Sequence, residues 1–183
     1  MIITITGKPC SGKGTVAKLF AKKYNYEYVC TGDMFRKLAT EMGFDDILTF
    51  QTENSEVNKV DHLVDNRIIE IGKTRSNENI IIDSRLAWHF IPNSFKVFID
   101  VDIETAGERL LNANRETEQV ESLPDAIETL QKRWSTENDR YTKLYRTNNL
   151  NLNNYNLVIN SSNLTPEEIV EQIKIAYDNF IKD

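Results

Sequence analysis

The chain has 183 residues, 40% of them hydrophobic and 9% aromatic, which suffices for one compact domain with its own core. Its formal net charge of −6 argues against a surface that coats nucleic acid, so any cluster of cations around an anion must be local. No run of 18 apolar residues occurs, and the two cysteines, Cys10 and Cys30, lack metal-ligand spacing. We expect a cytoplasmic monomer that binds small molecules and has neither a nucleic-acid nor a membrane partner.

The chain opens with an apolar run, Ile2–Thr6, followed by the glycine-rich segment Gly7–Thr15. Gly7, four intervening residues and then Gly12 and Lys13 give the spacing at which backbone N–H groups curl around a phosphate. Apolar residues at helical spacing between Lys13 and Tyr24 predict a helix whose N-terminus faces that phosphate. This order of strand, loop and helix predicts a nucleotide-binding phosphate loop, and the alternative is a glycine-rich turn without a ligand.

Each residue of this segment is a candidate for binding the phosphates of a nucleotide: Gly7, Lys8, Pro9, Cys10, Ser11, Gly12, Lys13, Gly14 and Thr15. The usual pattern has Ser or Thr directly after the lysine, in contact with Mg²⁺. Here Gly14 takes that place and Thr15 follows it, so residue 14 offers no hydroxyl to the metal.

Further β-rich runs follow, separated by stretches of helical periodicity: Tyr26–Cys30, Asn79–Asp83, Phe95–Asp100 and Asn156–Asn160. Their apolar residues do not alternate with polar ones, as expected for strands covered on both faces. The pattern predicts an α/β fold, a P-loop NTPase-type doubly wound sheet of five parallel strands, with ligands at the carboxyl ends of the strands. Thr165, Pro166 and Glu168 predict the capped start of a last helix.

Two segments without strand patterns interrupt the sheet, Thr31–Lys73 and Asn112–Leu123, and we interpret both as insertions over the site. The asparagine-rich stretch Thr147–Asn156 is typical of a surface loop rather than a functional tract.

Polar side chains follow the second and third predicted strands. Thr31 or Asp33 can cap a helix whose first turn carries Arg36, which could grip a second phosphate, and the alternative is a solvated arginine. Asp83 ends the third strand, where a carboxylate can order the waters around Mg²⁺. Arg85 follows, and its guanidinium can clamp a phosphate bidentately.

More arginines come later in the chain. Arg109 and Arg115 flank the start of the second insertion, while Arg133 and Arg140 lie two helical turns apart, so we expect them on one face of a helix. Phosphoryl transfer depends mainly on positioning and on cations that stabilise the transferring group. For each arginine the alternative is a surface ion pair with neighbouring Glu or Asp side chains.

The ordered set of these motifs resembles the nucleoside monophosphate kinases and, more narrowly, the short cytidylate kinases of archaeal type, over nearly the whole chain. The matching segments are Gly7–Thr15, Thr31–Arg36, Asp83–Ala87, Arg133–Tyr141 and Val158–Glu167. The resemblance implies one kinase domain, 1–183, with a core of 1–30, 74–111 and 124–183. The other two parts would be a helical NMP-binding insertion of about 31–73 and a short lid of about 112–123.

The resemblance also implies ATP and Mg²⁺ as cofactors and transfer of a phosphoryl group to CMP or dCMP. The catalytic residues would be Lys13, Arg115, Arg133 and Arg140. The substrate-binding residues would be Thr31, Asp33, Arg36, Asp61, Arg67 and Arg85. Thr15 and Asp83 would contact Mg²⁺ through water.

Three alternatives remain open at this point. Thr31–Met34 resembles the corresponding segment of adenylate kinases, so AMP is a second candidate acceptor. Another small-molecule P-loop kinase and a non-catalytic nucleotide-binding module are the others.

Overall fold

The structure, a computed structural model, describes residues 1–43, 57–113 and 120–182. Five strands form one parallel sheet in the order β2-β3-β1-β4-β5. The strands are β1 (Ile3–Gly7), β2 (Glu27–Cys30), β3 (Ile80–Asp83), β4 (Phe95–Asp100) and β5 (Leu157–Asn160). The predicted fold class and all five predicted strands are confirmed, and the strand ends differ from the prediction by at most one residue.

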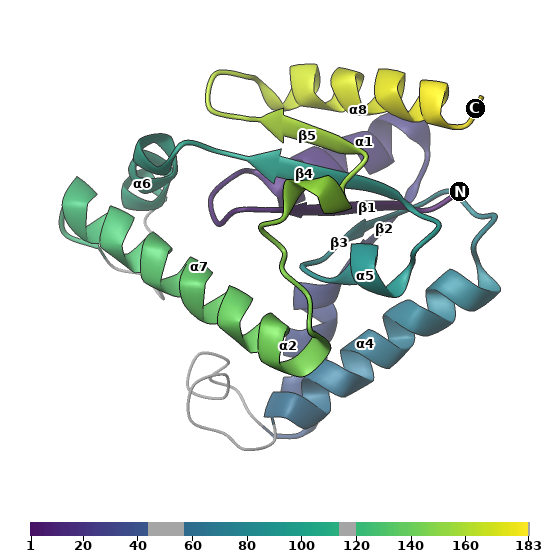
Figure 1. Cartoon of the computed structure of the whole chain (residues 1–183), viewed down its shortest axis with the longest axis horizontal. Coiled ribbons are helices and arrows are strands. Elements are labelled where there is room, and N and C mark those ends of the chain that lie inside the picture. Colours follow the sequence, from purple (N-terminus) through teal and green to yellow (C-terminus); the bar gives the residue numbers. More distant parts are fainter. Residues whose placement is uncertain (44–56, 114–119, 183) are drawn as a thin grey trace.

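Helices connect the strands and surround the sheet (Figure 1). They are α1 (Lys13–Tyr24), α2 (Thr31–Glu41), α4 (Val57–Thr74), α5 (Ala87–Phe90), α6 (Ile103–Asn112), α7 (Leu123–Tyr145), α8 (Pro166–Phe180) and the short 3₁₀ helix η1 (Leu152–Asn154). The predicted helix after the phosphate loop and the predicted cap of the last helix are both confirmed. Thr165 caps α8 in a reciprocal capping box with Glu168.

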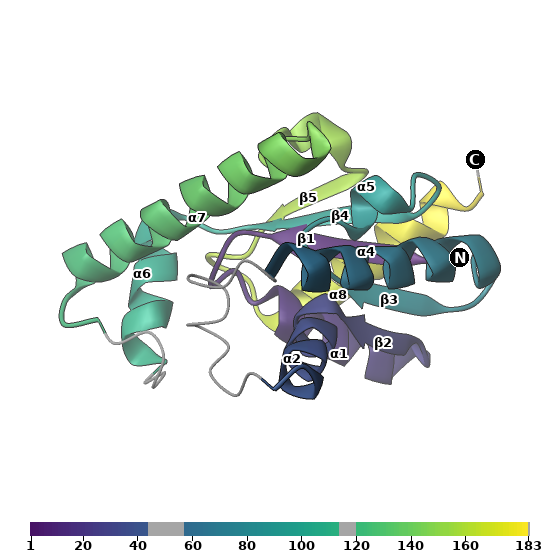
Figure 2. The same cartoon turned by 90° about the horizontal axis from the view of Figure 1, so that it is seen from below.

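Both faces of the sheet are covered, as Figures 1 and 2 show. Ile3 and Ile5 of β1 point to the face where α1 and α8 pack. Ile2, just before β1, and Ile82 of β3 lie on the other face, with Ile68 of α4. Successive residues of a strand point to opposite faces, so strands buried on both sides are apolar without alternation. This is the pattern from which the sequence predicted a doubly wound sheet.

The long helix α7 packs along α6 and lies outside the two layers that cover the sheet (Figures 1 and 2). Ser122 caps it, because its hydroxyl accepts the backbone N–H of Asp125. Its C-terminal half lies near α4, and Arg140 and Tyr145 of α7 contact Asp61 and Asp65 of α4. Helix α7 therefore joins the α6 side of the molecule to the α4 side.

The described parts of the two predicted insertions contain no strand. Helices α2 and α4 make up the described part of Thr31–Lys73, and residues 44–56 lie outside it. Of the second insertion, residues 114–119 lie outside the described part, between the end of α6 and the start of α7. None of the described helices is both long and apolar enough to cross a membrane.

The surface-loop prediction for Thr147–Asn156 is right for Asn151 and Asn153, which are exposed, but wrong for Thr147 and Asn149, which are buried. The Asn149 side chain is buried, and its amide oxygen accepts the indole N–H of Trp88 at 3.0 Å. A buried amide needs such a partner, and Trp88 on α5 supplies it. The middle of this loop therefore packs into the protein beside the carboxyl ends of the strands.

Candidate active site

The phosphate loop Gly7–Thr15 joins β1 to α1 at the carboxyl edge of the sheet. Gly12 has φ +81°, which only glycine adopts without strain, and a Cβ on Gly7 would lie 2.3 Å from the carbonyl oxygen of Ile99. Cys10 also has a positive φ of 58°. Successive positive and negative φ values turn backbone N–H groups toward one side, where the N-terminus of α1 adds its dipole. The loop is thus a backbone cradle for an anion.

Lys13, at the start of α1, is paired with the carboxylate that ends β3. Its Nζ lies 2.5 Å from Asp83 Oδ1, and the hydroxyl of Tyr28 donates to Asp83 Oδ2 at 3.2 Å. Asp83 is only 4% exposed. Burial lowers the pKa of Lys13, and nearby Arg85 lowers it further, against the opposing effect of Asp83. The strand pairing of β1 with β3 therefore brings the loop lysine and the predicted magnesium-ordering carboxylate together.

Two side chains fasten the outer side of the loop. Lys8 Nζ lies 2.6 Å from Asp100 Oδ1 at the end of β4 and 4.3 Å from the centre of the Trp134 ring. Arg109 of α6 donates to the carbonyl oxygen of Cys10 at 3.2 Å and to Ser161 Oγ at 3.1 Å. Arg109 thus contacts the loop itself, and among the described residues it does not form the surface ion pair considered as its alternative.

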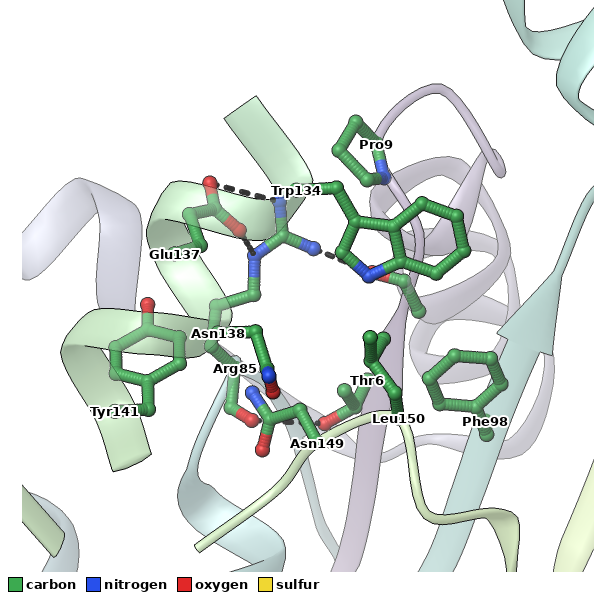
Figure 3. A pocket seen from close by; sticks show the side chains of 11 residues that line it. Thr6, Pro9, Arg85, Phe98, Trp134, Glu137, Asn138, Tyr141, Asn149 and Leu150 are labelled. Atoms are coloured by element: carbon green, nitrogen blue, oxygen red, sulfur yellow. Dashed lines mark hydrogen bonds and ion pairs between the residues drawn. The ribbon is translucent and has the colours of Figure 1, made fainter. Parts of the chain in front are cut away.

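Arg85 lies between the loop and α7, at the edge of a small pocket (Figure 3). Its Nε is 2.9 Å from Glu137 Oε2, and its Nη1 donates to the carbonyl oxygen of Gly7. Glu137 also accepts from Arg133 Nε at 3.2 Å. The pocket is lined by Thr6, Gly7, Pro9, Arg85, Phe98, Trp134, Glu137, Asn138, Tyr141, Asn149 and Leu150.

Helices α4 and α7 are joined by two polar contacts between their side chains. Arg140 pairs with Asp61, and the hydroxyl of Tyr145 donates to Asp65. Burial raises the pKa of both carboxyls, although Arg140 opposes the rise at Asp61 and the Tyr145 hydroxyl opposes it at Asp65. The Nε of Arg140 is buried and meets no hydrogen-bond acceptor within the described residues.

The remaining predicted residues are less closely gathered. Thr31 donates to the backbone carbonyl of Asp83 at 3.3 Å. Arg36 pairs with Asp33 on the surface of α2, where their side chains are 57% and 60% exposed. Arg67 is exposed on α4, Thr15 is exposed on α1, and Arg115 lies outside the described residues.

The predicted cap of α2 is wrong. The helix begins at Thr31 itself, Cys30 is its N-cap, and no side chain caps it. Thr31 and Asp33 are therefore residues of the first turn. The Thr31 hydroxyl donates to the carbonyl oxygen at the end of β3, and the Asp33 carboxylate pairs with Arg36. Neither side chain therefore caps the helix.

The site fits a nucleotide phosphate better than a metal ion bound by protein alone. The hydroxyl oxygen of Ser11 is buried in the loop and has no hydrogen-bond partner within the described residues. A Cβ on Gly14 would lie 3.1 Å from Asp83 Oδ2. A side chain at position 14 would therefore crowd the Asp83 carboxylate. Across the described chain, no three His, Cys, Asp or Glu side chains gather closely enough to hold a metal. Phosphate oxygens and water would have to supply most of the ligands of a Mg²⁺ ion here.

Sequence reasoning missed several contributors. Glu137 is one of the neighbouring acidic side chains that the sequence suggested only as surface partners of the arginines, yet it pairs with both Arg85 and Arg133. Tyr28 holds Asp83, and Asn149 and Trp134 line the pocket. The period of α7 placed Glu137 one turn after Arg133, but only the fold brings Arg85 to the same carboxylate.

A phosphate loop between the first strand and helix of a β2-β3-β1-β4-β5 parallel sheet, with lysine and arginine at its carboxyl edge, defines a P-loop protein of the kinase type. Sequence comparison narrows this class. The Cytidylate kinase-like family matches residues 2–163, and the chain belongs to that family.

Two curated relatives illustrate the range of similarity. The cytidylate kinase of Methanocaldococcus jannaschii is 32% identical over the full length of both chains. An S-adenosylmethionine-dependent nucleotide dehydratase of Lacinutrix mariniflava is 33% identical over 93% of this chain, which corresponds to 34% of that protein. Similarity to this chain is therefore also found in one segment of a longer protein that is named a dehydratase rather than a kinase.

Solved structures share the fold at low identity. The shikimate kinase of Bacteroides thetaiotaomicron has a TM-score of 0.67 and 16% identity, with coverage of 100% of this chain and 99% of that chain. At this identity the similarity supports the fold, and the substrate must be argued from the site and the family.

Proposed function

We propose that the protein transfers the γ-phosphoryl group of ATP to CMP or dCMP. The observation that carries the proposal is the convergence of Lys13 and Arg85 on one side of the phosphate loop, in a chain of the Cytidylate kinase-like family. Each cation is held by its own carboxylate, Asp83 or Glu137. Two fixed cations beside one anion cradle suit a reaction in which two phosphate groups meet.

In this proposal the loop amides and Lys13 bind the phosphates of ATP, and Arg85 and Arg36 bind the phosphate of the acceptor. A bond forms between an acceptor phosphate oxygen and the γ-phosphorus while the bond from that phosphorus to the β–γ bridging oxygen breaks. Mg²⁺ would neutralise charge on the β and γ oxygens. Thr15 and Asp83 are the residues that would hold its waters.

We assign the acceptor base and sugar to the segment of about 31–73, which includes Thr31, Asp33, Asp61 and Arg67. The lid would be the segment of about 112–123, which carries Arg115. Arg133 and Arg140 of α7 would approach the transferring group when these two segments close. Closure would exclude water, which otherwise competes as the phosphoryl acceptor.

A substrate panel tests the proposal. CMP, dCMP, UMP, AMP and dTMP are each offered with ATP and Mg²⁺, and ADP formation is followed in a coupled assay. CMP or dCMP should give the highest kcat/KM. A wide preference for AMP would favour adenylate kinase activity, which the sequence of Thr31–Met34 leaves open. Absence of turnover with every acceptor, together with ATP binding, would favour a non-catalytic nucleotide-binding module.

A further inference from the structure

We propose that Glu137 is a positioning residue that orients the Arg85 guanidinium toward the acceptor phosphate. The inference rests on the proposed function, because it assumes that Arg85 binds the phosphate of a nucleoside monophosphate. Glu137 touches no reacting atom in this scheme and acts through Arg85.

The contacts of Arg85 define its orientation. Glu137 accepts from Nε at 2.9 Å and, at the longer distance of 3.5 Å, from Nη2. The carbonyl oxygen of Gly7 accepts from Nη1. A guanidinium has five N–H groups in one plane, so within the described part of the chain these three contacts leave one N–H on each terminal nitrogen. Two such donors on neighbouring nitrogens form the fork that binds two oxygens of a phosphate.

Burial makes this partner necessary. The side chain of Arg85 is 20% exposed and that of Glu137 is 27% exposed. Moving an unpaired guanidinium out of water is unfavourable, and a carboxylate in hydrogen-bonding geometry offsets that cost. Burial would raise the pKa of Glu137, but Arg85 and Arg133 outweigh it and hold this pKa below its usual value. Glu137 is therefore ionised at neutral pH.

The two partners come from different parts of the fold. Arg85 follows β3, next to the loop, whereas Glu137 lies in the middle of α7. Figure 3 shows the Glu137 carboxylate facing Arg85 across the edge of the pocket. Arg133 lies one helical turn before Glu137 and binds the same carboxylate. The orientation of Arg85 thus depends on where α7 lies relative to β3.

A different role for Glu137 makes the opposite prediction. A carboxylate that merely occupied the phosphate site would compete with the acceptor, and its removal would lower the KM for CMP. A positioning carboxylate supports the acceptor site, and its removal raises that KM. The sign of the change distinguishes the two roles.

The experiment compares Glu137→Ala, Glu137→Gln and the control Glu128→Gln, an exposed glutamate on the same helix. Steady-state kinetics give kcat and the KM values for CMP and ATP, and calorimetry measures CMP binding without ATP. Loss of a hydrogen bond to a charged group predicts a rise of about tenfold in the KM for CMP in Glu137→Ala. Glu137→Gln should recover part of the loss, because its amide oxygen still accepts from Nε. The KM for ATP should stay close to that of the wild type in both variants.

Thermal unfolding identifies any variant that fails to fold, and Glu137→Gln, which keeps the side-chain volume, then carries the test. An unchanged or lower KM for CMP, or an equal rise in both KM values, would overturn the positioning role. If the wild-type protein phosphorylates neither CMP nor dCMP, the proposed function itself fails and this inference fails with it. Turnover by the wild type with unchanged Glu137 variants refutes only the inference.

Discussion

The two halves of the candidate site are built in different ways. The donor half is a continuous segment, Gly7–Thr15, whose shape comes from backbone angles and from close contact with β4. The acceptor half depends on side chains that meet across elements far apart in the sequence, such as Arg85 with Glu137 and Arg140 with Asp61. The donor half thus takes its shape mainly from consecutive backbone, to which Arg109 of α6 adds one side-chain contact. The acceptor half instead needs α4 and α7 in place to bring its side chains together.

Some residues of the two halves also differ in burial. Ser11 of the loop and Asp83 beside it are buried, while Asp33 and Arg36 on α2 are exposed. Preorganised groups stabilise a transition state without reorganising, so changes in the donor half should affect turnover with every acceptor. Changes in the acceptor half should affect each acceptor differently.

Lys13→Met should have the largest effect. It removes the loop side chain that pairs with Asp83 and leaves that buried carboxylate without this cationic partner. We expect kcat/KM to fall about 10³-fold with every acceptor, at the upper end of the loss for one electrostatic contact to the transferring group. Lys22→Met, at an exposed position on the same helix, is the matched control. An effect confined to CMP would contradict the assignment of Lys13 to the donor half.

Arg133→Ala and Arg140→Ala should come next. We expect each to lower kcat about 10²-fold with little change in the KM for ATP, because these arginines would contact the transferring group only after closure. Arg140→Ala also removes the partner of Asp61, so it should in addition raise the KM for CMP. Lys132→Ala, exposed on α7, serves as the control. Unchanged kcat in both variants would favour the non-catalytic module.

The donor half was largely predictable from sequence. Its chemistry lies in consecutive residues, so the spacing of Gly7, Gly12 and Lys13 is enough to predict a phosphate loop. The sheet was predictable for a related reason, since strands buried on both faces are apolar throughout. Each strand is followed in the sequence by a helix, so the apolar pattern of consecutive residues was enough to predict both.

The acceptor half was predictable only in part. The sequence supplied its arginines but not their partners, because Glu137 and Asp61 are brought to them by the packing of α7 against distant elements. Asn149 escaped prediction since Asn148 and Leu150 beside it are exposed, and its side-chain partner, Trp88, is distant in the sequence. The cap of α2 was wrong because Thr31 instead contacts the end of β3. Long-range contacts of this kind leave no local pattern.

Arg109→Met tests whether the shape of the donor half depends on a side chain from outside the loop. Arg109 holds the carbonyl of Cys10, whose positive φ is uncommon for a residue other than glycine. Losing this charged donor should raise the KM for ATP about tenfold and leave the KM for CMP unchanged. Cys10→Gly removes the backbone strain, so the Arg109→Met change should cost less in that background. Equal losses in both backgrounds would mean that Arg109 does not act through the backbone strain at Cys10, and an unchanged KM for ATP would mean that it does not support the loop.

The pH dependence of stability gives the smallest effect. The folded pKa of Glu137 lies below its unfolded value of 4.5, so its ion pairs with Arg85 and Arg133 stabilise the fold fully above pH 4.5. That contribution is lost as pH falls through the lower, folded pKa. The stability difference between wild type and Glu137→Gln, measured by denaturant unfolding, should therefore be largest at neutral pH and shrink below pH 4.5.

Asp61 and Asp65 titrate in the opposite sense. Their folded pKa values are raised, first by burial, so their protonation favours the fold at low pH and this advantage is lost as pH rises. Both residues are unchanged in Glu137→Gln, and their effect cancels in the difference. The stability difference between wild type and Glu137→Gln could instead stay constant through acid pH. That result would mean that no ion pair holds α7 to Arg85, and that the acceptor half does not depend on this contact between distant elements.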